Sequence, residues 1–184
     1  MSAPEARNIL RIPGRLVKDP TNLSAAYPHG GTELGIVRSI IFKPGLAIER
    51  LVAEEFKTTV NAIVTGYEAV LGCVLRSWDN DMLAAVFPNI QTDGFGEVGV
   101  LGRVNAARRA GFDMAELAFK LLFVPIAADQ HRWLLLHNAI PLVDETQELR
   151  MALSEEYGLS IMFHAAPDSQ GRTHTWDLKE NISL

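Results

Sequence analysis

The sequence has very little cysteine and no long apolar run, and each absence narrows the class of protein. Cys73 is the single cysteine among 184 residues, so the chain forms no internal disulfide and offers no cysteine cage for zinc. The N-terminal segment MSAPEARNILRIPGRL lacks the uninterrupted apolar core of a signal peptide, and no apolar run is long enough to span a bilayer. We therefore expect a protein without membrane contact that stays in a reducing cytoplasm unless it leaves by lysis or as part of a particle.

An excess of basic charge is also missing. The chain has 17 Lys and Arg residues against 22 Asp and Glu, a net charge of −5, whereas nucleic-acid binders usually carry a basic patch. Its 48% apolar and 21% charged residues are typical of a soluble globular protein, and 184 residues fit one domain. We expect a single domain over residues 1–184, with a flexible N-terminus at residues 1–8 and a loop insertion at residues 89–113.

No motif in the sequence has the context that catalysis or cofactor binding needs. A G-x-S-x-G nucleophile elbow is absent, and the glycine pair after His29 lacks the Lys-Ser/Thr of a phosphate-binding loop. Gly94, Gly96 and Gly99 form a G-x-G-x-x-G, but they follow a predicted helix and loop instead of a buried strand. Cys73 lies in mid-strand, where a small buried hydrophobe is expected. We predict a protein that is not an enzyme and has no cofactor and no metal.

What the sequence does contain is a series of strand-like segments, concentrated between Ile36 and Pro88. Strands this close together with short connections must be antiparallel, because a parallel pair needs a long crossover. Asp79 and Pro88 delimit one short helix at about residues 79–87. The pattern predicts a mainly β fold, an antiparallel β-barrel or sandwich of about eight strands with one short α-helix and long loops.

Turn-forming residues predict where the strands of this central stretch end. Pro44-Gly45 and Gly66-Tyr67 predict turns, and Glu54 to Thr58 predicts a charged hairpin tip. The other expected strands lie at residues 9–18, 117–124, 131–139, 148–153, 157–165 and 173–178. A long loop is expected at Asp19 to Gly35, which is rich in glycine and proline.

Histidines in the late strands give an alternative from a different class, a cupin-like metal-dependent β-barrel enzyme. His131, His137, His164 and His174 lie in or beside these strands, with Asp177 or Glu156 as a carboxylate ligand. No H-x-H or H-E-x-x-H spacing is present, and histidine is also an ordinary strand residue. A monomeric β-sandwich binding module is a third alternative.

The order of features resembles the major tail tube proteins of tailed bacteriophages. That family has a strand with a G-x-E-A-x-L-x-x-x-L pattern, then a helix of the L-A-x-x-x-P type, and a late strand that enters an A-x-P-D-x-x-G turn. The matching residues here are Gly66, Glu68, Ala69, Leu71 and Leu75, then Leu83, Ala84 and Pro88, then Ala165, Pro167, Asp168 and Gly171. The resemblance runs from about Pro20 to Leu178, with the poorest match from Asn89 to Asp113.

The resemblance implies a structural virion protein, located in the phage tail and assembled in the host cytoplasm. Hexameric rings of this subunit would stack into a tube through which DNA passes during genome ejection without specific binding. Partners would be other tail proteins: baseplate or hub, tail terminator, tape measure and, in contractile tails, sheath. A tube-like baseplate protein or an injection-system protein, including the type VI secretion tube, fits the same resemblance.

The candidate residues of the assembly are charged. An acidic channel suits DNA that must slide, since every phosphate contact adds affinity, although most soluble proteins are mildly acidic as well. The candidate bore or ring-contact residues are Glu49, Glu54, Glu55, Glu68, Arg103, Arg108 and Arg109.

Overall fold

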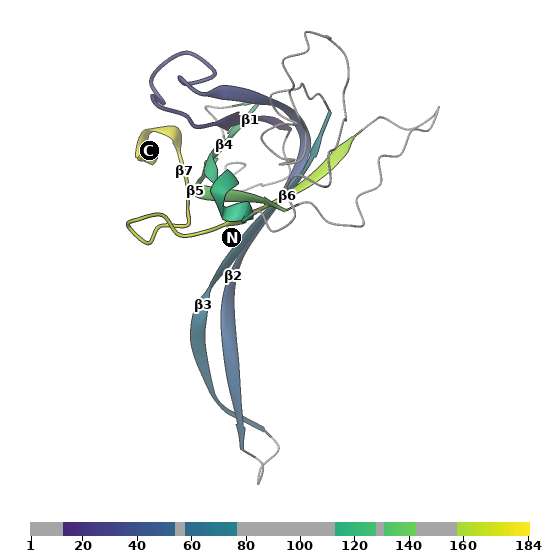
Figure 1. The fold of residues 1–184 in the computed structure, drawn as a ribbon, viewed down its shortest axis with the longest axis vertical. Helices are drawn as coiled ribbons and strands as arrows, with labels where there is room; N and C mark the ends of the chain where they lie inside the picture. The colour runs from purple at the N-terminus through teal and green to yellow at the C-terminus, as the bar shows by residue number, and fades with distance from the viewer. Residues whose placement is uncertain (1–12, 54–57, 77–112, 128–130, 143–157) are drawn as a thin grey trace, which may run out of the picture.

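The computed structural model describes residues 13–53, 58–76, 113–127, 131–142 and 158–184 (Figure 1). Its strands are β1 (Gly14–Lys18), β2 (Thr32–Ala53), β3 (Thr58–Leu75), β4 (Phe119–Pro125), β5 (Trp133–Leu142), β6 (Leu159–Ala165) and β7 (His174–Asp177). Two short 3-10 helices, η3 (Met114–Leu117) and η4 (Lys179–Asn181), are the helical elements of this described part. None of the helices described here is long and apolar enough to cross a membrane.

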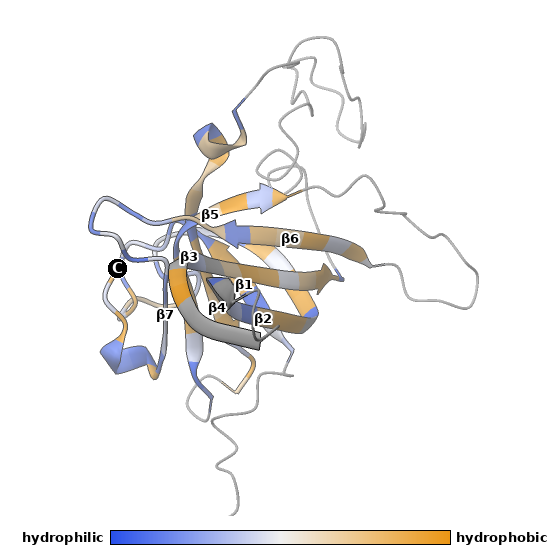
Figure 2. Ribbon diagram, turned by 90° about the horizontal axis from the view of Figure 1, so that it is seen from below, coloured by the Kyte–Doolittle hydropathy of each residue, from blue (hydrophilic) through white to orange (hydrophobic). Residues whose placement is uncertain are grey.

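Six of the strands form a closed antiparallel barrel, which confirms the predicted fold class. Their order is β4-β1-β2-β3-β6-β5, and β4 pairs with β5 to close the cylinder (Figure 2). The seventh strand, β7, pairs with β5 next to the barrel. Closure removes the open sheet edges that a flat sheet of the same strands would expose.

The barrel interior is filled with apolar side chains that alternate along each strand. On β3, Ala69, Leu71, Cys73 and Leu75 are buried, while the residues between them are partly exposed. Cys73 is therefore the small buried hydrophobe that its position in the sequence predicts, and burial raises the pKa of its thiol to about 12. A thiol with such a pKa is a poor nucleophile at neutral pH.

A second apolar cluster covers the outside of the barrel over β4 and β5. Trp133, Leu122 and Leu135 are buried there beneath the loop from Asp19 to Gly31 and the C-terminal residues. The covering side chains include Leu23, Tyr27, Ile182 and Leu184. One outer face of the barrel thus behaves as core, because the chain folds back over it.

Two predicted turns are wrong, because β2 and β3 run straight through them. Pro44-Gly45 lies within β2 and Gly66-Tyr67 within β3, in the same ladder, where Gly45 pairs with Glu68 and Leu46 with Tyr67. Proline is tolerated there because β2 is paired on one side only at this point, as at a sheet edge. The hairpin reverses once, between Ala53 and Thr58, where the charged tip is expected.

Several other predictions lie wholly or largely outside the described residues. These are the N-terminus at 1–8, the helix at 79–87, the insertion at 89–113 with its G-x-G-x-x-G, and the strand at 148–153. Asp113, the last residue of the insertion, is described, and its carboxylate accepts the N–H of Ala115 at 2.9 Å at the start of η3.

We predict that Leu71→Ala lowers the free energy of unfolding by about 2–5 kcal/mol, because it leaves a cavity in a closed interior. Ile41→Ala, on the outside of the neighbouring strand, is the control and should cost less than about 0.5 kcal/mol in a dilute monomer. Urea unfolding measures both. Equal losses in the two variants would contradict the assignment of Leu71 to the interior.

Candidate functional site

The most prominent feature of the fold is a two-stranded arm that extends beyond the barrel (Figure 1). β1 pairs with β2 only over Thr32 to Val37, and β6 pairs with β3 only over Ala69 to Leu75. Residues Leu46–Ala53 of β2 and Thr58–Tyr67 of β3 therefore pair only with each other. We call these two segments the arm.

Local sequence explains why the arm is a curved ribbon. Its β3 segment, TTVNAIVTGY, is rich in β-branched residues, which favour the pleated conformation. The ladder shifts register twice in the arm, and each shift skips one residue of β3, Thr65 and Val60. An extra residue of this kind bends its strand and increases the local twist. The arm accordingly curves away from the barrel axis (Figure 1).

Both long edges of the arm are open within the described part of the protein. The outer edge of β2 is unpaired along the arm, and so is the outer edge of β3. An exposed strand edge presents a row of backbone donors and acceptors that can pair with another strand. The arm therefore has the geometry for adding strands from other chains.

The arm also carries exposed apolar side chains. Tyr67 is 72% exposed, Val64 53% and Ile63 46%. Tyr67 continues the alternation of the buried residues Ala69 and Leu71, on the same face of β3. The pattern that fills the barrel thus continues past its end, where the described structure has no core to receive it.

Of the predicted acidic site residues, the structure places two on or beside the arm. Glu49 is exposed in the middle of the arm, opposite Ile63, and Glu68 lies at its base, opposite Gly45. Glu54 and Glu55 lie outside the described residues, between the two arm strands in sequence. Arg103, Arg108 and Arg109 also lie outside the described residues, so their role at the bore or between rings stays a prediction.

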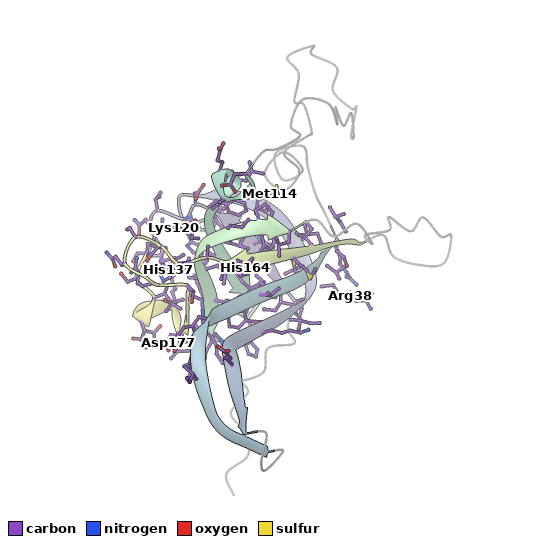
Figure 3. All side chains as sticks on the ribbon, turned by 60° about the horizontal axis from the view of Figure 1, so that its bottom comes forward. Arg38, Met114, Lys120, His137, His164 and Asp177 are labelled. Atoms are coloured by element: carbon purple, nitrogen blue, oxygen red, sulfur yellow. The ribbon has the colours of Figure 1, made fainter. Side chains whose placement is uncertain are left out.

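The late-strand histidines do not converge in the described structure. His137, His164 and Asp177 lie on different strands, β5, β6 and β7 (Figure 3). His174 packs edge-on against Phe42, with 4.9 Å between the ring centroids. Within the described ranges, no three histidine, cysteine or acidic side chains are grouped to hold a metal ion. The cupin-like alternative therefore gains no geometric support there.

His137 belongs instead to a polar cluster that closes the turn before β7. Its Nε2 lies 2.9 Å from the Thr175 hydroxyl, and its Nδ1 lies 4.0 Å from an oxygen of Asp168. Asp168 accepts the backbone N–H groups of Gln170 and Arg172, and the Arg172 guanidinium donates to the same carboxylate. The turn itself was evident from its Pro-Asp and Gly residues, whereas nothing in the sequence paired it with His137.

The cluster has the character of a structural support. Burial lowers the pKa of His137 and the Arg172 charge lowers it further, against the opposing effect of Asp168. The ring is therefore neutral at pH 7, and it is fully covered, with no exposed side-chain surface. We interpret the cluster as an anchor that fixes the turn of residues 166–173 against β5.

A comparison of the sequence with models of known families found no match, and a comparison with curated proteins found none either.

Low pH should reduce the free energy of unfolding through His137, because the pKa of this residue is lower in the folded protein than in the unfolded chain. The unfolded chain takes up a proton at the ordinary pKa near 6.5, while the folded protein resists it, so stability falls as the pH drops below that value. We predict that His137→Asn makes this loss shallower, by at most about 1.4 kcal/mol per pH unit. Urea unfolding at pH 7 and pH 5 measures it. An unchanged dependence in the variant would contradict the buried neutral state, even though His174, whose pKa is also lowered by burial, retains part of the slope.

Proposed function

We propose that this chain is a structural subunit, not an enzyme, that assembles with copies of itself into rings stacked as a tube, in the manner of phage tail tube proteins. The single observation that carries the proposal is the arm, which extends apolar side chains and two open strand edges beyond a barrel that is already closed. The motif resemblance supplies the particular kind of assembly.

The open edges favour a ring over a simple pair. The two arm strands run in opposite directions, so when neighbouring arms point the same way, β2 of one copy lies antiparallel to β3 of the next. Such a contact joins two different surfaces of the same chain, and repeated rotation closes it into a ring. The arm's eight residue pairs correspond to a wall about 26 Å tall.

The apolar face of the arm gives the assembly its driving force. Tyr67 and Val64 are each more than half exposed. In the ladder they pair with Leu46 and Ile48. Apolar side chains gathered on one projecting element mark an interaction surface in soluble proteins. Burial of this face between neighbours would stabilise the ring by the ordinary hydrophobic effect.

Charge in the arm, at its tip and at its base agrees with a channel for DNA. Residues 46–68 contain four carboxylates, Glu49, Glu54, Glu55 and Glu68, against two cations, Arg50 and Lys57. Glu54, Glu55 and Glu68 would be the residues that line the channel, where their charge would repel phosphates and let DNA pass without salt-dependent adhesion. In a phage particle, the ends of such a tube would meet the baseplate or hub at one end and the tail terminator at the other.

Removal of the arm should abolish assembly and leave the barrel folded. Gly45 and Glu68 pair directly, so residues 46–67 can be replaced by Asn-Gly, the two-residue turn that joins antiparallel strands with the correct twist. We predict a monomer with an intact β spectrum at every concentration, whereas the full chain forms rings or tubes when concentrated. Analytical ultracentrifugation and negative-stain microscopy measure this.

The matched control exchanges only the tip, residues 54–57, for a short neutral turn and keeps both arm strands. That variant should still assemble. Rings formed by the chain without its arm would overturn the proposal, and so would a full chain that stays monomeric at high concentration with and without DNA-free tail extract as initiator.

A further inference from the structure

The outside of the barrel carries an apolar row across β2, β3, β6 and the end of β5, apart from the covered cluster of Trp133 and Leu135. In the register of the sheet, Ile41 of β2 pairs with Gly72 of β3, Gly72 with Met162 of β6, and Met162 with Leu142 of β5. Ile41 is 56% exposed and Leu142 38%. We call these four residues the docking face; the apolar colouring of β3 and β6 is visible in Figure 2.

The residues around the docking face extend its apolar character. Val70 and Val74 flank Gly72 on the same side of β3, and Ile140 lies beside the row on β5; all three are partly exposed. Lys43 is exposed at the border, paired with Val70. His164 lies between Val70 and Ile140 in the register, so the row is an apolar strip with two polar residues, Lys43 and His164, at one margin.

The same barrel shows what happens to an apolar outer face when the chain can reach it. Over β4 and β5, the loop of residues 19–31 and the C-terminal residues bury Trp133 and Leu135 to 1% exposure or less. Ile41 and Leu142 have no comparable cover in the described structure. An exposed apolar strip of this kind is stabilised when another surface covers it.

The arm bears a matching surface that cannot reach its own docking face. Glu49 and Ile63 are ladder partners, both exposed, and Glu49 lies on the same side of β2 as Ile41 and Lys43 because the register shifts of the arm skip residues of β3 only. Eight residues of one extended strand separate Ile41 from Glu49, about 26 Å. The two surfaces lie on the same side of one ladder and do not face each other, so we take a second copy as the partner.

We propose that the Glu49–Ile63 side of one arm docks on the Ile41–Gly72–Met162–Leu142 face of a second copy of this chain. Ile63 covers the apolar strip, and Glu49 pairs with Lys43 of the second copy. The opposite side of the arm, with Tyr67 and Val64, stays available for the neighbours within a ring. The inference rests on the proposed self-assembly and assigns one of its contacts, a contact between the arm and the outside of another barrel.

Gly72 can be replaced by cysteine, as an attachment point for a cross-linker in the docking face, without disturbing the fold. A Cβ added there meets only the carbonyl oxygen of Ile41, at 3.8 Å, an ordinary contact. Glycine at this point also leaves the strip flat, which permits close approach of another strand. The native Cys73 beside it is buried with a raised pKa, so it does not compete for a thiol reagent at neutral pH.

Cross-linking between two separately prepared populations tests the contact. Copies with Ile63→Cys are mixed with copies with Gly72→Cys under assembling conditions and treated with a short bifunctional maleimide. We expect a covalent dimer that contains one copy of each population, identified by mass spectrometry. Ile126→Cys replaces Gly72→Cys in the control, since Ile126 is 66% exposed just after β4, which β1 separates from β2 in the sheet; it should give no dimer.

A charge exchange tests the same contact by an independent route. Glu49→Lys and Lys43→Glu each place like charges together, so each single variant should need a severalfold higher concentration to assemble. The double variant restores the opposite charges with reversed sign and should assemble like the original chain. A merely structural role of either residue would not produce such rescue.

The outcomes separate this inference from the proposed function. Assembly without the Ile63–Gly72 cross-link, or without rescue in the double variant, overturns the docking contact and leaves the tube proposal standing. Absence of any assembly overturns both. Equal cross-linking at Ile126 and at Gly72 also overturns the contact, because it would show random collision.

Discussion

The structure depends on one uninterrupted ladder, the antiparallel pairing of β2 with β3 from Val37 and Leu75 to Ala53 and Thr58. One half of this ladder forms two of the six walls of the barrel, and the other half is the arm. Because side chains alternate between the two faces of a strand, the register of the barrel half also fixes the side of the arm to which each side chain points. A one-residue slip would expose Leu71 and Phe42 and bury Lys43. The packing of the barrel interior therefore determines which side chains lie on each side of the arm.

The ladder also explains why the arm is expected to be unstable on its own. An isolated two-stranded ribbon is at best marginally stable in water, and this one is anchored to the barrel only at its base. Its apolar side chains and open edges add a cost that no described part of the same chain removes. Pairing with other copies lowers that cost along the whole arm at once. Formation of a rigid arm and assembly are thus expected to be coupled, with the closed barrel as the part that folds first and alone.

Sequence patterns located the strands well because alternation is a local signal, as at Leu159, Ile161 and Phe163 on β6. They misplaced the turns at Pro44-Gly45 and Gly66-Tyr67, because both pairs lie inside one continuous ladder, where Pro44-Gly45 pairs with Ala69 and Glu68, and Gly66-Tyr67 with Ala47 and Leu46. The pairing of β1 with β4, and the contact of His137 with the turn at Asp168, join segments far apart in sequence, and no local pattern encodes them. The acid Glu49 was singled out from charge alone, whereas its pairing with Ile63 on the arm comes from the register.

The two outer faces of the barrel point to an order of assembly. The face over β4 and β5 is covered by the chain itself, so it is complete in a single folded copy. Ile41 on the barrel and Ile63 on the arm lie on the same side of the β2–β3 ladder, so they do not face each other within one copy. Complementary surfaces at two different places on one chain generate head-to-tail growth, not a closed pair. In the proposed assembly, the barrel would fold first, and the subunit would bury its full apolar surface only once it contacts other copies.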